Sequence, residues 1–242
     1  MFKFLKNIMN NEKIYLNNDT NSLHRILKTD IKKDPDINED EIIFGCGCFW
    51  GAEKCFWKLP GVVTTSVGYA GGEKSNPTYY EVCSGLTGHS EVVRVIWDKR
   101  EIDISDLLKM FWECHDPTQK NRQGNDIGTQ YRSAIYSKNE NNLKIILASK
   151  EQYQKELNKK NLGLIETEIK IIDSYFYAEQ YHQQYLASAG SRQYCSASPT
   201  KVKLGVFIGS KYKLKDHIWE NFNWEVDKCV LRSDNNPIKN NI

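Results

Sequence analysis

Short apolar runs and stretches of helical spacing alternate between residues 41 and 189. Runs typical of buried or alternating strands cover residues 41–45, 62–69, 90–98, 131–136 and 166–172. Helical spacing and flanking Pro or Gly predict helices over 52–59, 77–82, 104–114, 139–160 and 175–189. The uneven alternation favours an α+β fold (two-layer α/β), with a ferredoxin-like mixed sheet and packed helices.

The two ends of the chain lack this patterning. Residues 1–40 are rich in Asn, Lys and Asp, which indicates a disordered extension or, because the first residues are basic and apolar, a targeting-like segment. Residues 41–210 are expected to form the functional domain, and residues 211–242 a tail with one short helix over 216–222. Residues 191–199 are small and polar, so a mobile loop is expected there, within a long irregular C-terminal segment.

Composition narrows the class of protein. The chain has 242 residues, of which 40% are hydrophobic, and this is enough for one domain with a proper core. No apolar run approaches the roughly 18 residues of a membrane span. The net charge of +2 is too small to predict a nucleic-acid or membrane surface. A soluble, monomeric globular protein is therefore expected.

The seven cysteines have an odd count and uneven spacing, which argues against a secreted disulfide framework. There is no Cys-x-x-Cys pair, and Cys46-x-Cys48 alone is weak evidence for metal, so no metal site is expected. A reducing compartment with one or two redox-active thiols fits better. The cytoplasm is the expected location, with an organelle as the alternative if residues 1–40 act as a targeting segment.

The pentapeptide Gly47-Cys48-Phe49-Trp50-Gly51 is the strongest local signal for chemistry. A thiol at a helix start is expected to favour the thiolate, because the positive end of the helix dipole stabilises the anion. The two aromatic residues supply an apolar wall for a small group such as a methyl. The alternative is a structural cysteine in an aromatic core.

Five segments in the same order resemble the peptide methionine sulfoxide reductase A family. They are residues 47–51, 66–72, 76–79, 82–91 and 122–133, and the resemblance extends over roughly residues 41–200. The resemblance implies a peptide-methionine (S)-S-oxide reductase that acts on peptide-bound and free methionine-S-sulfoxide and repairs oxidised proteins. It also implies that no cofactor is bound and that thioredoxin, or a similar dithiol, is the external reductant.

The resemblance further implies roles for residues around the pentapeptide. Cys48 is the nucleophile and becomes a sulfenic acid, and Phe49 and Trp50 form the methyl pocket. Glu91 is the acid that protonates the sulfoxide oxygen. Because Glu91 lies at the start of an apolar strand, burial is expected to raise its pKa.

Later positions complete the implied site. Tyr79 and Tyr131 match tyrosines that hydrogen-bond the sulfoxide oxygen, and Asp126 matches an aspartate that holds substrate. Cys195 matches the resolving cysteine, which would attack the sulfenic acid and form an intramolecular disulfide. Without the resemblance, Asp126 is equally consistent with a carboxylate that caps the loop.

The chain departs from the family pattern in its other cysteines. Many relatives carry another cysteine soon after the resolving one, whereas Ser196 to Thr200 contain none. Cys229 is expected to be a free surface thiol, although a second resolving role stays open. Cys46 is expected to fill a strand end. The cycle is therefore expected to use Cys48 and Cys195 only.

Two rival functions remain at this point. A cysteine hydrolase would need a histidine base, for which His89 and His115 are the candidates, although both are expected to be structural. A redox sensor without turnover is the second rival. The full set of polar and aromatic positions argues against the sensor.

Overall fold

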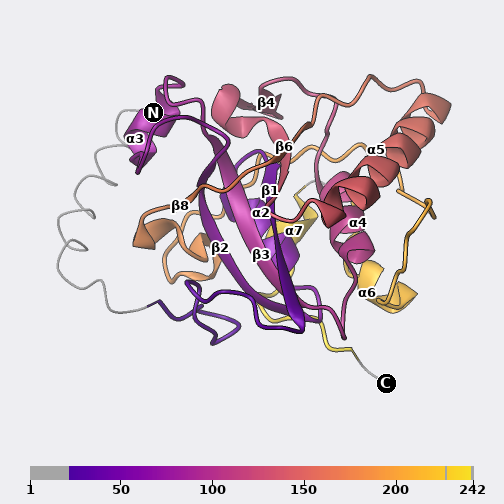
Figure 1. Cartoon of the computed structure of the whole chain (residues 1–242), viewed down its shortest axis with the longest axis horizontal. Helices are drawn as coiled ribbons and strands as arrows, with labels where there is room; N and C mark the ends of the chain where they lie inside the picture. The colour runs from indigo at the N-terminus through magenta and orange to yellow at the C-terminus, as the bar shows by residue number, and fades with distance from the viewer. Residues whose placement is uncertain (1–21, 227, 241–242) are drawn as a thin grey trace.

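The computed structural model describes residues 22–226 and 228–240 (Figure 1). Its main sheet has six strands in the order β7-β6-β1-β3-β2-β8, and only the β6–β7 pair is parallel. The strands are β1 Glu39–Cys46, β2 Val62–Ala70, β3 Ser90–Asp98, β6 Ser133–Ser137, β7 Glu168–Ile171 and β8 Tyr175–Tyr177. A mixed sheet with packed helices is therefore confirmed.

Six α-helices accompany the sheet in the described residues. They are α2 Phe49–Trp57, α3 Tyr79–Cys83, α4 Ile104–Cys114, α5 Asn141–Lys159, α6 Asp216–Trp219 and α7 Cys229–Arg232. The inner part runs β1-α2-β2-β3-α4-β6 in chain order, with the short helix α3 between β2 and β3. Helix α4 begins where predicted because Asp103 and Asp106 form a capping box.

The polar loop after α4 contains short elements that the pattern did not predict. A two-stranded hairpin joins β4 Arg122–Gln123 to β5 Asp126–Ile127, and the 3₁₀ turn Thr129–Tyr131 follows it. The predicted strand at residues 131–136 begins only at Ser133 because this turn occupies its first position. The hairpin and the turn bring polar side chains of the loop to the end of the sheet.

The core lies between the sheet and helices α2 and α4. Alternation along β1 places Ile42 and Phe44 in this core and Ile43 in a smaller cluster on the opposite face. The Phe44 ring stacks on Phe56 of α2 at 4.8 Å and on Phe111 of α4 at 5.1 Å between centroids. These contacts join both helices to the central strand that leads to Cys48.

The helix predicted over residues 175–189 is wrong. The segment contains strand β8 and two 3₁₀ turns, Gln180–His182 and Tyr185–Ala187, separated by Gln184 in the left-handed conformation (φ 46°). Tertiary hydrogen bonds override helical propensity: the buried Gln183 side chain bonds both the N–H and the C=O of Val67. The segment therefore follows the surface of β2 as extended chain and turns.

Ordered chain begins before residue 41. His24 is fully buried, and its Nε2 lies 2.9 Å from Thr65 Oγ1 of β2. Arg94 of β3 donates to the backbone oxygens of Ile31 and Lys33. Residues 22–38 thus pack against the sheet. The predicted disordered extension is wrong for this part of the chain. The prediction for residues 1–21 lies outside the described residues.

The C-terminal tail returns to helix α2. Residues 191–206 contain no helix or strand, as expected of a long irregular segment, and α6 lies within the predicted helix at 216–222. Helix α7 was not predicted. Beyond it, Lys54 and Trp57 of α2 donate hydrogen bonds to the backbone oxygens of Ser233 and Asn235. The tail therefore covers the side of α2 that the sheet leaves open.

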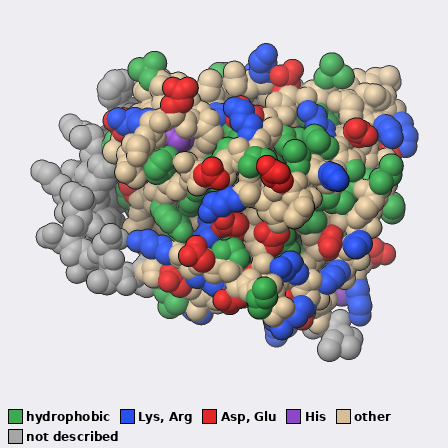
Figure 2. Space-filling model, viewed as in Figure 1, with side chains coloured by type: hydrophobic (Ala, Val, Ile, Leu, Met, Phe, Trp, Pro, Cys, Tyr) green, Lys and Arg blue, Asp and Glu red, His purple; other side chains and the backbone are tan. Residues whose placement is uncertain are grey.

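The surface shows no concentration of one charge on the face in Figure 2, where basic and acidic side chains are interspersed. None of the described helices is long and apolar enough to cross a membrane.

Replacing Phe44 should test the importance of the three-ring stack. We expect Phe44→Ala to lower the free energy of unfolding by about 3–5 kcal/mol, because it removes a fully buried ring between two helices. Leu164, which is 73% exposed, supplies the control: Leu164→Ala should change stability by less than about 0.5 kcal/mol. Urea unfolding of both variants measures the difference, and equal losses would contradict the assigned core.

Candidate active site

Cys48 occupies the N-cap position of α2, immediately after β1. The turn between the two elements requires glycine: Gly47 has φ +86°, and a Cβ there would lie 2.5 Å from the Gln123 side chain. The strand, the turn and the helix start thus hold the thiol at the end of the sheet, partly buried.

The expected low pKa of Cys48 is wrong for the substrate-free site. Burial raises the pKa of the Cys48 thiol well above its usual value, and the carboxylates of Glu91 and Asp126 raise it further. The Trp50 N–H at the helix start lowers this pKa but does not outweigh these effects. Cys48 therefore rests as a thiol and must lose its proton during the reaction.

Glu91 is the second residue of β3 and is only 1% exposed. Its Oε2 accepts the Phe49 backbone N–H at 3.1 Å, so the carboxyl lies directly at the first turn of α2. Burial raises the pKa of Glu91 to about 8, as predicted, since the Phe49 hydrogen bond only partly offsets desolvation. Glu91 is therefore mainly protonated at neutral pH and can donate a proton.

Tyr79, Tyr131 and Asp126 lie near Cys48 and Glu91. Burial, followed by the nearby Glu91 carboxylate, raises the pKa of both tyrosines, so both phenols stay donors. The Oδ1 atom of Asp126 accepts the Tyr194 hydroxyl at 2.6 Å. Its Oδ2 is buried and has no hydrogen-bond partner among the described residues, so it is available to a bound molecule.

Phe49 and Trp50 belong to an aromatic pocket wall. The Trp50 ring stacks on Tyr185 with centroids 3.9 Å apart, and its Nε1 donates to Nδ1 of His182 at 3.1 Å. The His182 ring also packs against Phe49 and Tyr79, at 5.1 and 4.6 Å between centroids. Burial lowers the pKa of His182 to about 3, so its imidazole is neutral. The wall is therefore uncharged and suits an apolar group.

The residues that support this wall were not predicted from the sequence. Glu179 accepts the Tyr79 N–H at 2.9 Å and the Tyr69 hydroxyl at 2.8 Å, and so holds α3 against β2. His182 and Tyr185 lie in the same segment. The local pattern gave no signal for this conformation, because Tyr177, Tyr181 and Tyr185 recur every four residues, which is the spacing of a helix face.

Cys195 lies against the first turn of α2 and is 3% exposed. Gly51 allows this approach, because a Cβ at Gly51 would lie 2.7 Å from the Cys195 sulfur. Burial raises the pKa of Cys195 to about 12. Cys229 is partly buried, not fully exposed at the surface, and lines the same small cavity as Cys195. All seven cysteines, each within the described residues, are free.

The two candidate histidine bases are structural, as predicted. The Nδ1 atom of His89 accepts the Gly72 N–H at 3.1 Å, and its Nε2 lies 2.7 Å from the Lys74 carbonyl oxygen. Both nitrogens of His115 are hydrogen-bonded, to the Phe111 carbonyl and to the Ser133 hydroxyl. With their nitrogens engaged elsewhere, neither histidine supports the hydrolase alternative.

The comparisons with known proteins all indicate the same family. A family model described as peptide methionine sulfoxide reductase matches residues 40–213. The chain is 54% identical over 180 residues to the protein MsrA of Vibrio vulnificus (74% of this chain, 86% of that protein). It is 57% identical over 164 residues to MsrA of Azotobacter vinelandii (68% and 76%). Both are named peptide methionine sulfoxide reductases.

Solved structures agree with these matches. Methionine sulfoxide reductase A of Corynebacterium diphtheriae is 42% identical, with a TM-score of 0.65, and covers 77% of this chain and 90% of its own. Reduced Mxr1 of Saccharomyces cerevisiae is 34% identical, with a TM-score of 0.60 (67% and 92%). Each likeness covers at least two thirds of this chain and nine tenths or more of the solved chain.

The raised pKa of Glu91 predicts how stability depends on pH. Because Glu91 binds its proton more tightly in the folded chain than at its usual pKa of 4.5, wild type should lose stability as pH rises from about 4.5 to about 8. Glu91→Gln should lack this loss. Urea unfolding of both proteins at pH 5, 7 and 9 should show a difference that grows to as much as about 4 kcal/mol. A pH-independent difference would contradict the assignment.

Proposed function

The chain belongs to the peptide methionine sulfoxide reductase A family and is an enzyme that reduces methionine sulfoxide; on this basis we propose that it uses Cys48, Glu91 and Cys195 to reduce the S epimer. One observation carries the mechanism: the Glu91 carboxyl reaches the first turn of the helix that Cys48 caps. A thiol and a neutral acid thus meet beside an apolar wall.

The first step transfers oxygen from the substrate to Cys48. The sulfoxide oxygen accepts hydrogen bonds from Tyr79, Tyr131 and the protonated Glu91, which makes its sulfur electrophilic. Cys48 attacks that sulfur while Glu91 protonates the oxygen, and the Glu91 carboxylate takes up the thiol proton. The S–O bond of the substrate breaks, and the oxygen passes to the Cys48 sulfur as a sulfenic acid. Methionine leaves, so one thiol and one sulfoxide yield one sulfenic acid and one thioether.

Substrate contacts explain why a methyl sulfoxide fits. The S-methyl group lies against Phe49 and Trp50, whose ring positions His182 and Tyr185 maintain. The buried Oδ2 of Asp126, which has no partner among the described residues, is available to a donor of the substrate such as a backbone N–H. The site accepts free and peptide-bound methionine sulfoxide, as the family resemblance implies.

The second step closes a disulfide. The Cys195 thiol attacks the Cys48 sulfenic acid, forms the S–S bond and releases water. Cys195 lies against the first turn of the helix that Cys48 caps, where a Cβ at Gly51 would come within 2.7 Å of the Cys195 sulfur. An external dithiol, thioredoxin or a similar protein, then reduces the bridge by thiol–disulfide exchange. The enzyme acts as a monomer in the cytoplasm, or in an organelle if residues 1–40 target it there, and repairs oxidised proteins.

Turnover of separate epimers tests this proposal. With dithiothreitol as reductant, wild type should reduce a blocked methionine-S-sulfoxide and leave the R epimer unchanged. Cys48→Ser should abolish reduction, and Glu91→Gln should slow the single-turnover step about 10²–10⁴-fold, the usual contribution of a general acid. A wild-type rate in Glu91→Gln would remove Glu91 from the mechanism. Stoichiometric consumption without turnover would favour the redox sensor.

Peptide mapping after one turnover without reductant tests the second step. We expect a Cys48–Cys195 bridge. Gly51→Ala should delay this bridge, because the added Cβ would displace the Cys195 sulfur. The sulfenic acid should then persist and react with dimedone.

Gly163→Ala serves as the matched control for that experiment. A Cβ at Gly163 would meet its nearest neighbour at an ordinary 3.5 Å, so disulfide formation should keep its wild-type rate. A dominant bridge to Cys46 or Cys229 would overturn the two-cysteine cycle.

A further inference from the structure

Five cysteines line one small cavity beside α2, which residues of the tail also line. The cavity has a volume of about 20 Å³, close to the space of one water molecule. Its sulfurs come from Cys46, Cys55, Cys114, Cys195 and Cys229. Only Cys195 has a role in the proposed reaction, so four of these thiols are unexplained.

Three of these thiols lie together in the core. Cys114, at the end of α4, lies close to Cys46 of β1 and Cys55 of α2, and its sulfur donates to the Phe111 carbonyl oxygen at 3.5 Å. Each of the three is no more than 3% exposed. Cys46 and Cys55 belong to consecutive elements, whereas Cys114 comes from a helix much later in the chain, so the fold brings it to the other two.

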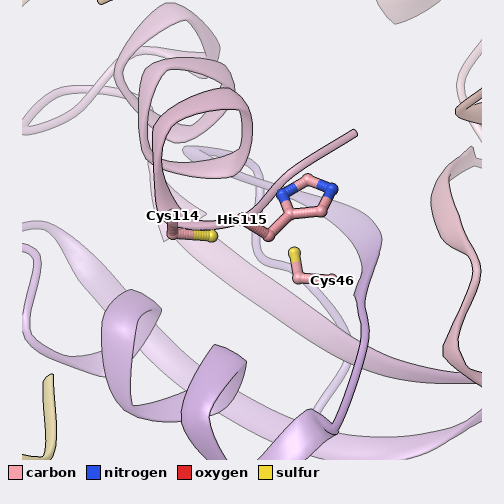
Figure 3. Close-up of side chains that lie close together, drawn as sticks. All are labelled: Cys46, Cys114 and His115. Carbon is pink, nitrogen blue, oxygen red and sulfur yellow. The ribbon is translucent and has the colours of Figure 1, made fainter. Parts of the chain in front are cut away.

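A histidine completes the group. The sulfurs of Cys46 and Cys114 and one ring nitrogen of His115 all lie within 4.8 Å of one another. In Figure 3, both sulfurs point toward the space beside the imidazole. Metal–sulfur bonds of about 2.3 Å and metal–nitrogen bonds of about 2.0 Å would require the three atoms to approach by only a few tenths of an ångström to about 1 Å.

We propose that Cys46, Cys114 and His115 bind one thiophilic d¹⁰ metal ion, of the Zn²⁺ or Cu⁺ class. Thiolate and imidazole are the ligands such ions prefer. Two thiolates and one imidazole leave one position of a tetrahedral zinc site open, and thiolate ligands also suit Cu⁺. Cys195 lines the same cavity, but the proposed ligands include neither catalytic thiol, and the site does not depend on the proposed function.

The surroundings fit a ligating imidazole. The Nδ1 atom of His115 lies 2.7 Å from the Phe111 carbonyl oxygen, which matches the carbonyl that usually orients a metal-bound histidine. Its Nε2 is bonded to the Ser133 hydroxyl, and this hydroxyl has a second partner, Thr167 Oγ1, at 2.8 Å. Ser133 can therefore release Nε2 to a metal and keep a hydrogen bond.

Binding changes the protonation of the thiols. Metal ions bind thiolates, so each ligating thiol must release its proton when the metal binds. Partly exposed Cys229 lies in the cavity wall, on the side where the tail covers α2.

The test uses the full chain with its catalytic thiols removed. Under anaerobic, reduced conditions, the Cys48→Ser/Cys195→Ser protein is titrated with Cd²⁺, which reports thiolate binding through its ultraviolet charge-transfer band, and with Cu⁺ against a chromogenic chelator. We expect one equivalent of at least one metal to bind, with proton release. Adding Cys114→Ala should weaken binding at least about 100-fold, more than the 10–100-fold effect of losing an outer-shell partner.

Two controls keep the result interpretable. Cys83→Ser, at the one exposed cysteine, should leave binding unchanged. Cys114→Ala alone, with Cys48 and Cys195 intact, should still reduce methionine sulfoxide, which shows that the fold survives. The proposal is overturned if neither metal binds the Cys48→Ser/Cys195→Ser protein, or if binding survives Cys114→Ala. Either result would leave the catalytic dithiol as the source of any metal binding by wild type.

Discussion

The hydrogen bond from the Phe49 backbone N–H to the buried Glu91 carboxyl joins the two halves of the site. Phe49 begins α2, and Glu91 begins β3. The bond satisfies one of the N–H groups that a helix start leaves unpaired, and it holds the acid next to the nucleophile. Because the carboxyl is buried, the same placement keeps it protonated near neutral pH.

The coupling of Glu91 and Cys48 explains why the resting thiol is protonated. An ionised Glu91 would oppose a thiolate at Cys48, and burial opposes both charges. The lowest-energy resting form at neutral pH is therefore a thiol beside a carboxylic acid. A substrate whose oxygen accepts the proton avoids two opposed negative charges in the buried site. The electrostatics therefore favour oxygen transfer, and not the hydrolysis that a thiolate–imidazole pair would catalyse.

The parts outside the central sheet act mainly by holding α2 and its surroundings. Residues 175–187 position the pocket wall through Glu179, His182 and Tyr185. The tail bonds the opposite side of α2 through Lys54 and Trp57. Between tail and helix lies the cavity with five cysteines. The helix that carries the nucleophile is thus enclosed on every side, which limits how far Cys48 and Cys195 can separate.

The sequence by itself determined the regular elements and the principal site residues. Strands β1 to β3 and helices α4 and α5 followed from local periodicity, and Cys48, Glu91, Tyr79, Asp126 and Tyr131 followed from motifs in order along the chain. Only the tertiary structure decided the conformation of residues 175–189, the packing of residues 22–38, the protonated state of Cys48 and the meeting of Cys46, Cys55 and Cys114. The physical reason is common to all four: each depends on burial or on hydrogen bonds between distant segments, which local pattern does not record.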